Sequence, residues 1–408
     1  MSITPPPSAV LSDDALSTRR AVLFLDQTSK LGGAELCLFD IVVGRGNPSD
    51  QVFLFEEGPL ADRFRAAGVG ISVCQLGDRG ASVRKGSGWM RKAASLGGVV
   101  RLARQVARQS RGVDVIYANT AKALVIGAIA GKMARRPVVY HLHDILSADH
   151  FSWSNRKILH TAAKLGVELT IANSQASAGS LIAAGFDPQR VVVIPNGIDP
   201  APFDAAIADS DRLRRALRQS LGLGEDEPLL GLFGRLSPWK GQHIAIESLE
   251  SLPGVHLLLV GDALFGEEAY VERLRRLAAR PGLEGRVHFV GFRDDVAGVM
   301  QGVDVVIHAS TSPEPFGRVI VEAMLASRPV VATRGGGASE IIDEGKNGLL
   351  CEPCSVKSLA EKVRLILAGG PQVEALVVRG GVSARERFAP GLILQQIETA
   401  LMRLPKKV

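Results

Sequence analysis

Short apolar runs alternate with amphipathic segments along most of the chain. Such runs are typical of strands in parallel sheets whose two faces are covered by helices. The alternation runs through the chain twice, so the sequence predicts an α/β protein with two doubly wound, Rossmann-like domains. The expected strands are residues 21–25, 52–55, 71–74, 113–117, 138–141, 169–172 and 191–194 in the first half, and 229–233, 256–260, 287–290, 304–307, 330–332 and 349–351 in the second. The clearest helical segments are 121–134, 270–279 and 359–367.

A segment rich in turn residues, 194–200 with the sequence IPNGIDP, separates the two patterns. Its prolines, asparagine and glycine favour a turn that ends a strand and redirects the chain. We therefore expect a first domain at 21–200 and a second at 201–385. Residues 1–20 have neither the basic start nor the apolar run of a signal peptide, and we expect a flexible tail. The remaining residues, 386–408, contain one expected helix without a strand partner.

The composition limits the classes of protein. With 46% hydrophobic and 22% charged residues, the 408-residue chain is globular rather than disordered. No apolar run approaches the roughly 20 residues of a membrane-spanning helix, so a cytoplasmic location is expected.

The net charge of +6 is unevenly distributed, because the whole basic excess lies in the first 200 residues. It is densest from Arg79 to Arg111, a stretch without an acidic residue, whose apolar positions indicate an amphipathic helix with a basic face. Such a face can be a solvated surface, a docking surface for an anionic membrane or a binding surface for an anionic acceptor. Nucleic acid is not an expected partner, because the aromatic residues for base stacking are missing.

The densest group of candidate functional residues lies in the segment 312–322, SPEPFGRVIVE, which follows an expected strand and opens a helix. Pro315 and Gly317 fix a tight turn and expose the first amides of that helix, a favourable place for phosphate. Glu322 stands among apolar residues, where hydrogen bonds from a ribose would stabilise its carboxylate. The alternative is an ion pair with Arg318, one helical turn away.

A second group, Arg235 and Lys240, lies in the segment 234–241, GRLSPWKG, directly after the first strand of the second half. Two cations around one turn can clamp a diphosphate, because arginine offers a fork of donors and lysine a movable point charge. The alternative is exposed loop charge, which is less usual for residues set beside two glycines and a proline.

The first half offers weaker signals. Gly32 and Gly33 follow the first strand and begin a helix, but the G-x-G-x-x-G pattern of a dinucleotide site is absent. His141, His143 and Asp144 stand at the end of a strand. A histidine beside an aspartate at that position can act at a reacting centre, or it can be a satisfied structural residue.

No metal or other cofactor is expected. The D-x-D sequence Asp209-Ser210-Asp211 introduces an expected helix, so we interpret it as a helix cap. Cys351 and Cys354 form a C-x-x-C pair, but no further cysteine pair or nearby histidine completes a zinc site.

Together these motifs resemble glycosyltransferase family 4, over nearly the whole chain from residue 21 to about residue 353. The most specific mark is the family's E-x7-E pattern, which Glu314 and Glu322 match. Supporting motifs are GGAE at 32–35, HD at 143–144, ANS at 172–174, IPNGID at 194–199, GRLSPWKG at 234–241 and GGGASE at 335–340. The Cys351–Cys354 pair departs from relatives, which often have aliphatic residues there.

The resemblance implies the GT-B fold, with two Rossmann-like domains facing each other across a cleft and a last helix that crosses back to the first domain. It also implies a retaining hexosyltransferase that uses a UDP- or GDP-linked sugar and no metal. The acceptor would be a glycan, a glycolipid or a small molecule, in exopolysaccharide, lipopolysaccharide or glycolipid synthesis at the inner face of the bacterial cell membrane.

The resemblance assigns roles to individual residues. Arg235 and Lys240 would hold the donor diphosphate, Glu322 the ribose and Glu314 the transferred sugar. The full implied donor-binding set is Gly33, Arg235, Lys240, Phe292, Glu314, Phe316, Gly317, Val319, Ile320 and Glu322. The residues implied to act at the reacting centre are His143, Glu314, Arg235 and Lys240.

Three alternatives remain open at this point. The same fold could serve a sugar-nucleotide epimerase, a family 4 transferase with a soluble small-molecule acceptor, or a protein without catalytic activity. The last predicts missing cations or carboxylates in the second half, and the motifs there are complete.

Overall fold

The computed structural model describes residues 19–74, 89–147, 151–263 and 266–405, with side chains from Gly97 onward in the helix that begins at Trp89. Residues 1–18 of the expected tail and the basic side chains from Arg79 to Lys92 lie outside the described residues. The chain divides into two compact units. The first contains residues 1–197 together with 390–408, and the second contains residues 198–389.

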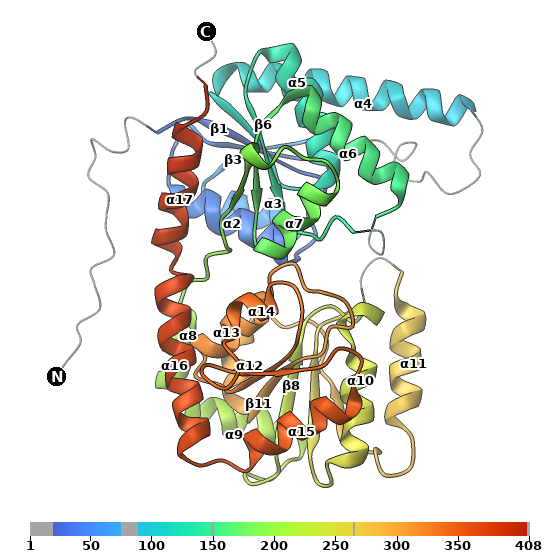
Figure 1. The fold of residues 1–408 in the computed structure, drawn as a ribbon, viewed down its shortest axis with the longest axis vertical. Coiled ribbons are helices and arrows are strands. Elements are labelled where there is room, and N and C mark those ends of the chain that lie inside the picture. The colour runs from blue at the N-terminus through green and yellow to red at the C-terminus, as the bar shows by residue number, and fades with distance from the viewer. Residues whose placement is uncertain (1–18, 75–88, 148–150, 264–265, 406–408) are drawn as a thin grey trace, which may run out of the picture. The chain divides into compact units, whose positions relative to one another are not determined.

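The first unit is built on a parallel sheet of seven strands in the order β3-β2-β1-β4-β5-β6-β7 (Figure 1). The strands are β1 (Val22–Asp26), β2 (Gln51–Leu54), β3 (Gly70–Val73), β4 (Val115–Ala118), β5 (Val138–Leu142), β6 (Val167–Ala172) and β7 (Val191–Val193). The helices of this unit are α2 (Gly33–Arg45), α3 (Pro59–Ala66), α4 (Trp89–Gln109), α5 (Ala121–Ala134), α6 (Trp153–Gly166), α7 (Gln175–Ala183) and α17 (Pro390–Met402).

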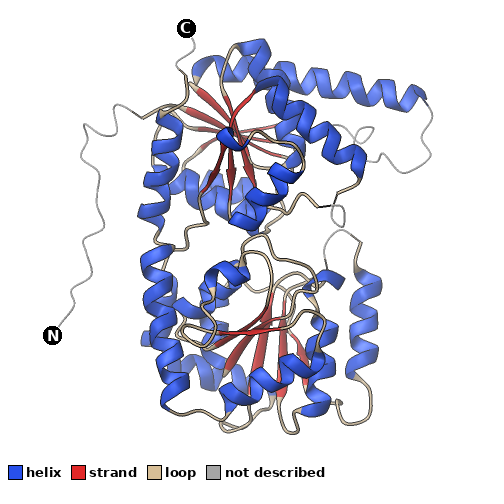
Figure 2. Cartoon of the chain, in the orientation of Figure 1, coloured by secondary structure: helices blue, strands red, loops and turns tan. Residues whose placement is uncertain are grey.

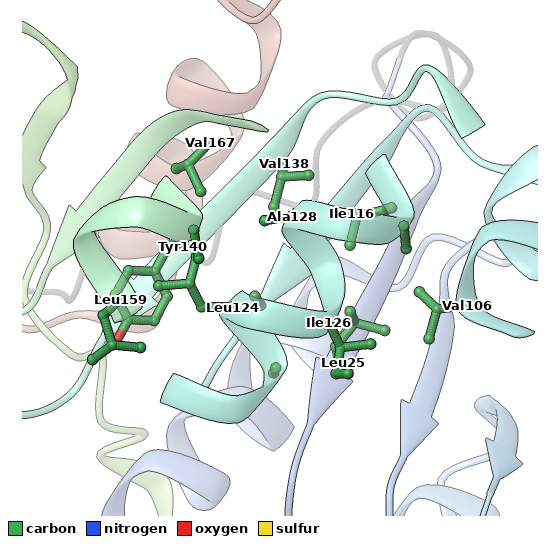
Figure 3. Close-up of a cluster of buried hydrophobic side chains, with 14 of the residues drawn as sticks. Leu25, Val106, Ile116, Leu124, Ile126, Ala128, Val138, Tyr140, Leu159 and Val167 are labelled. Carbon is green, nitrogen blue, oxygen red and sulfur yellow. The ribbon is translucent and has the colours of Figure 1, made fainter. Parts of the chain in front are cut away.

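Side chains of successive strand residues point to opposite faces of this sheet, so each strand contributes to two cores. Leu25 of β1 belongs to the core under α4, α5 and α6, whereas its neighbour Phe24 belongs to the core under α2, α3 and α17. Figure 3 shows the first of these cores, in which Leu124, Ile126 and Ala128 of α5 lie against side chains of the strands. The continuous apolar strands of the sequence are therefore buried on both faces.

The second unit has a parallel sheet of six strands in the order β10-β9-β8-β11-β12-β13, also with helices on both faces (Figure 2). The strands are β8 (Leu229–Phe233), β9 (His256–Val260), β10 (Val287–Phe289), β11 (Val305–His308), β12 (Val330–Thr333) and β13 (Leu349–Cys351). The helices are α8 (Ala201–Ala208), α9 (Ser210–Leu221), α10 (Gln242–Ser248), α11 (Glu268–Ala278), α12 (Val296–Gly302), α13 (Arg318–Leu325), α14 (Ala338–Ile341), α15 (Val356–Leu367) and α16 (Pro371–Arg387).

The expected fold of two doubly wound α/β sheets is confirmed, and each expected strand forms with its ends shifted by at most a few residues. The helix α16 was not expected, and residue 385, where the second domain was expected to end, lies inside it. Its buried stripe is Leu376, Gly380 and Ala384. Two of these three residues are small, so the stripe carries little of the apolar signal that reveals a helix.

The last helix, α17, belongs to the first unit. Its buried residues Ile393, Ile397 and Leu401 join the core under α2. Glu398 of α17 also pairs with the buried Arg45 of α2, with 2.6 Å between Oε1 and Nη1.

No single helix among the described residues has the length and apolar composition needed to cross a membrane. The segments Val356–Leu367 and Pro371–Met402 meet that test only when they are joined across a sharp bend.

Candidate functional site

Each sheet has one point at which the strand order reverses. In the first unit it lies between β1 and β4, and in the second between β8 and β11. Ligands of doubly wound proteins bind beyond the carboxyl ends of the strands at such points. In this chain both points carry a cluster of polar side chains.

The cluster of the second unit surrounds the carboxylate of Glu314, in the loop between β11 and α13. Lys240 donates to both oxygens, with Nζ at 2.9 Å from Oε1 and 2.8 Å from Oε2. His308, the last residue of β11, lies with Nε2 at 3.0 Å from Oε2. The hydroxyl of Ser310 donates to the same oxygen at 2.9 Å. We call these four residues the Glu314 cluster.

The charge of Glu314 is stabilised by its partners. Burial alone would raise the pKa of the carboxyl, but the charge of Lys240 and the hydrogen bonds from His308 and Lys240 outweigh it. The pKa of Glu314 therefore lies well below its ordinary value. The side chain is only 10% exposed, so Glu314 is a buried carboxylate that stays ionised.

Close backbone contacts hold the loops of the Glu314 cluster in place. A Cβ on Gly241, directly after Lys240, would lie 1.8 Å from the carbonyl oxygen of Ala309. A Cβ on Gly336 would lie 2.1 Å from the carbonyl oxygen of Glu314. Both glycines have positive φ, and the amide of Gly337 donates to that same carbonyl at 2.8 Å. The GGG sequence at 335–337 thus packs directly against the backbone of the Glu314 loop. This close packing explains why glycines stand in the GGGASE motif.

The start of α13 was expected to expose amides for a phosphate. Gly317 is the N-cap residue, with φ of 103°, and α13 begins at Arg318 as expected. The amide of Ile320 already donates to the carbonyl of Gly317 at 2.9 Å. The side chains of Phe316 and Ile320 are buried in the core, and the ring of Phe316 packs against Phe388. The side chains of Phe316 and Ile320 are therefore part of the core rather than of a ligand-facing surface.

The other expected donor residues of the second unit are paired with neighbours or exposed. Glu322 makes the helical ion pair with Arg318, with 3.2 Å between Oε1 and Nε. Arg235 lies with Nε at 3.5 Å from Oε2 of Glu267. Phe292 is 53% exposed. The structure thus joins Lys240 to Glu314, while it places Arg235 beside Glu267 and Glu322 beside Arg318.

The cluster of the first unit is a chain of hydrogen bonds that ends at His143, directly after β5. Nε2 of His143 lies 2.8 Å from Oδ1 of Asn119, which follows β4. Nδ2 of Asn119 in turn donates to Oδ2 of Asp26, the last residue of β1, at 2.7 Å. We call these three residues the His143 relay. The three residues lie at the ends of the adjacent strands β1, β4 and β5, and their hydrogen bonds hold the imidazole of His143 in place.

The groups around the His143 relay are held neutral by burial. Burial, together with the charge of Glu35, raises the pKa of Asp26 to about 8. Burial and the neighbouring His143 lower the pKa of His141 well below its ordinary value. His141 is 1% exposed, and its Nδ1 lies 2.7 Å from the hydroxyl of Tyr117. At neutral pH the relay therefore starts from a protonated carboxyl.

Gly33 and Asp209 each lie at the start of a helix, α2 and α9 respectively. Gly33 is the first residue of α2, and a Cβ there would meet no described atom within 4 Å. Asp209 precedes α9, but its carboxylate makes no capping hydrogen bond. It accepts instead from Nε of Arg212 at 2.8 Å, so the expected role as a side-chain cap is wrong. The nearby arginine competes for the carboxylate more strongly than the helix amides do.

Comparison with known proteins identifies the family. The family model "Glycosyl transferases group 1" matches residues 214–380, and the model "Glycosyltransferase Family 4" matches residues 59–202. A crystal structure of Anabaena Alr3699/HepE in complex with UDP and glucose is 42% identical in sequence. It superimposes with a TM-score of 0.84, over 94% of this chain and 100% of that one. The chain belongs to the group 1 glycosyltransferases.

Two further relatives of this transferase match over shorter regions. The lipopolysaccharide core biosynthesis glycosyltransferase LpsE of Rhizobium meliloti is 37% identical over 163 residues, 40% of this chain and 46% of LpsE. The chain therefore covers less than half of LpsE. A D-inositol 3-phosphate glycosyltransferase of Xylanimonas cellulosilytica is 28% identical over 298 residues, 70% of this chain and 71% of that one.

Several polar groups of the transferase were missed in the sequence. His308 and Ser310 lie just before the expected motif, and His308 closes a strand whose other residues are apolar. Asp26 and Asn119 likewise end or follow buried strands. The signal that could have found them is a lone polar residue at the carboxyl end of a buried strand next to the reversal point.

Proposed function

We propose that this glycosyltransferase takes a hexosyl group from a UDP-linked sugar and transfers it to a glycan or glycolipid acceptor with retention of the anomeric configuration. The observation that carries the proposal is the Glu314 cluster. It presents a buried, ionised carboxylate and an ammonium group at the reversal point of a doubly wound sheet. The choice of UDP is supported by a second crystal structure of Alr3699/HepE, in complex with UDP-glucose, for which the sequence identity is 41%.

The pattern of donors on Glu314 suggests how the sugar binds. Among the described residues, Oε2 accepts from Lys240, His308 and Ser310, whereas Oε1 accepts from Lys240 alone. Each carboxylate oxygen has about two lone-pair sites, so Oε1 can accept one hydrogen bond besides the one from Lys240. We assign the next position, on Oε1, to a hydroxyl of the transferred sugar.

Lys240 is suited to bridge the sugar and the diphosphate. An ammonium has three N–H donors, and two of the Lys240 contacts go to Glu314. The third can donate to a phosphate oxygen and stabilise the charge that develops on the leaving UDP. Arg235 and the amide of Val319 at the start of α13 would share that charge, which is the reason that we expect no divalent metal.

His143 would act on the sugar or its acceptor. The transfer breaks the bond between the anomeric carbon and the diphosphate, forms a bond to the acceptor oxygen and releases one proton from the acceptor hydroxyl. In a retaining reaction the departing diphosphate oxygen can accept this proton on the same face of the sugar. The relay from Asp26 through Asn119 would orient the imidazole of His143 for a hydrogen bond at this centre.

The acceptor and the location belong to this proposal as well. The described part of α4 buries Leu102, Ala103 and Val106 in the core and exposes Arg101, Arg104 and Arg108. A membrane would thus meet only the basic face, through electrostatic attraction to anionic lipid. We propose a peripheral position at the inner face of the cell membrane. Binding to anionic vesicles that weakens with salt would support it, and equal binding to neutral vesicles would contradict it.

A donor assay tests the activity without a known acceptor. The thermal midpoint of the protein is first measured with UDP, GDP and ADP, since a ligand bound only by the folded state raises it. The protein is then incubated with UDP-glucose, and water serves as a slow acceptor. Proton NMR at early times shows whether the released glucose is the α anomer, as retention from UDP-α-glucose requires.

Three results would contradict the proposal. A larger stabilisation by GDP or ADP than by UDP would overturn the choice of donor. Conversion of UDP-glucose into another UDP-sugar, without release of UDP, would identify an epimerase instead. Full activity of K240M would remove the Glu314 cluster from the mechanism.

A further inference from the structure

His143 and two residues near it could also bind a metal ion. Among the described residues, one set of three metal-ligating side chains comes together, formed by Cys37 of α2, His141 of β5 and His143. One donor atom from each lies within 4.8 Å of the other two. We propose that these three residues form a binding site for a zinc-like transition-metal ion, and that occupation of this site inhibits the transferase.

The donor set selects the class of ion. One thiolate and two imidazoles are typical ligands of Zn²⁺, which favours sulfur and nitrogen, whereas Mg²⁺ and Ca²⁺ require oxygen ligands. In a tetrahedral zinc site such donors lie roughly 3.3–3.6 Å from one another. The three donor atoms therefore need to approach one another by about 1.5 Å at most. Three protein ligands leave the fourth position to water, as in zinc sites that are open to solvent.

The surroundings of both histidines are those of metal ligands. A metal-bound imidazole generally holds its other ring nitrogen in a hydrogen bond, which fixes the ring. Nδ1 of His141 lies 2.7 Å from the hydroxyl of Tyr117, and Nε2 of His143 lies 2.8 Å from Oδ1 of Asn119. The coordinating atoms would thus be Nε2 of His141 and Nδ1 of His143.

The buried nitrogen of His141 is an independent sign of a ligand. Its Nε2 is buried and has no hydrogen-bond partner among the described residues, although the side chain is 1% exposed. A buried polar atom without a partner costs about 1–3 kcal/mol, so its persistence calls for an explanation. A bound ion supplies the missing partner.

Cys37 completes the site from the other side. It is 2% exposed, forms no disulfide and donates its thiol hydrogen to Oδ1 of Asn196 at 3.3 Å. Coordination would release the thiol proton to solvent and form a bond between Sγ and the ion. His143 is half-buried, which gives the ion a route from solvent to the two buried ligands.

Inhibition follows from the shared residue. An imidazole that coordinates an ion through Nδ1 cannot use this atom in the reaction, and the ion adds positive charge beside the reacting centre. This inhibitory part rests on the proposed function, because it requires His143 to act in transfer. The binding part does not rest on it.

Binding is tested directly on the whole 408-residue chain, reduced and free of metal. Isothermal titration with Zn²⁺ is expected to show one tight site, and Co²⁺ is expected to give the absorption of a tetrahedral ion with a thiolate-to-metal band. C37S keeps a hydrogen-bond donor for Asn196 but loses the thiolate, so its affinity should fall at least about 100-fold, more than outer-shell changes cause. Y117F removes an outer partner only and should weaken binding by about 10- to 100-fold.

Two cysteine variants serve as matched controls. Cys74 lies in the same unit but donates to Gln105, and Cys354 is the exposed cysteine of the C-x-x-C pair. C74S and C354S should bind Zn²⁺ as the wild type does. Tight binding that survives in C37S, or that disappears in C354S, would overturn the site.

The inhibitory part has its own readout. UDP-glucose turnover of the wild type should fall when one equivalent of Zn²⁺ is added and recover with a chelator, while C37S should keep its rate in both conditions. Stoichiometric Zn²⁺ binding with an unchanged rate would overturn the inhibition and leave the site standing. A protein that binds Zn²⁺ but turns over no UDP-sugar would count against the proposed function and not against the site.

Discussion

The Glu314 cluster and the His143 relay both lie at the reversal point of their sheet, yet their carboxyl groups differ in protonation. In the second unit a buried carboxylate is kept ionised, because an ammonium and two further donors converge on it. In the first unit the carboxyl of Asp26 is kept protonated, because burial and the nearby Glu35 both disfavour its charge. The topology fixes where polar groups gather, and the local partners decide how they are protonated.

This difference suits two different tasks. An ionised carboxylate with its own cation can bind hydroxyl and phosphate groups of a donor without a change of protonation. A neutral chain of hydrogen bonds can orient an imidazole without placing a second charge beside it. The comparison therefore predicts that the second unit is sensitive to the loss of charge and the first to the loss of a hydrogen-bond pattern.

The largest expected effect is the loss of Lys240. In K240M the buried carboxylate of Glu314 has no cation, so the free energy of unfolding should fall by about 3–5 kcal/mol. The turnover efficiency with UDP-glucose should fall by about 10- to 100-fold or more, as expected for a lost charge-assisted hydrogen bond. Chemical denaturation and UDP-release kinetics measure the two effects.

A double variant separates stability from function. K240M/E314Q removes both charges, so it should regain a large part of the stability that K240M loses, while its activity should remain as low as that of either single variant. Recovery of activity in the double variant would mean that the ion pair is structural only and that the charge is not used in transfer.

The two carboxyl groups should give pH dependences of opposite sign. Between the ordinary pKa of 3.8 and about 8, folded Asp26 binds a proton that the unfolded chain does not, so its contribution to stability falls as the pH rises. D26N should remove this slope, which is at most about 1.4 kcal/mol per pH unit. Denaturant unfolding at several pH values between about 5 and 8 provides the measurement.

Glu314 should give the opposite pH dependence of stability. Its pKa is lower in the folded state than in the unfolded chain, so its stabilisation is full above about pH 5 and is lost as the pH falls toward the depressed pKa. E314Q should therefore flatten the acid side of the stability profile and leave the slope near pH 7 unchanged. Equal slopes for the wild type and D26N near pH 7 would contradict the protonated state of Asp26.

A smaller effect is expected at His308, which donates one of the hydrogen bonds to Glu314. H308A should lower the free energy of unfolding by about 1–3 kcal/mol and reduce turnover by roughly tenfold. H308Q provides the matched control, because the glutamine amide can place a donor where Nε2 of His308 lies. Similar losses in H308A and H308Q would show that the imidazole acts through more than this hydrogen bond.

The contrast between the units also explains what the sequence could predict. The strands and their order of alternation follow from continuous apolar runs, because a strand that is buried on both faces needs them. The residues of the donor motif could be proposed because they stand together in the sequence. The helix α16 was missed because small residues such as Gly380 form its buried stripe.

Contacts between distant segments could not be predicted. Lys240 and Glu314 were assigned to different parts of the donor, whereas the structure joins them in one ion pair. The partners of His143 come from the ends of β1 and β4, and each is a single polar residue that shows no pattern by itself. Only the strand order brings such residues together, and this order is a property of the fold rather than of local spacing.

Glycines provide the last comparison and the smallest expected change in stability. At Gly336 a Cβ would collide with the backbone of Glu314, whereas at Gly33 it would meet no described atom within 4 Å. G33A should therefore change the free energy of unfolding by less than about 0.5 kcal/mol, or stabilise α2 slightly, since alanine favours helices.

If phosphate oxygens of the donor approach Gly33, the KM for UDP-glucose should still rise several-fold. G179A, in the middle of α7 and equally unobstructed by described atoms, is the matched control and should leave the KM unchanged. An unchanged KM in G33A would show that the start of α2 does not bind the donor. Of the residues considered in the first unit, the His143 relay alone would then take part in transfer.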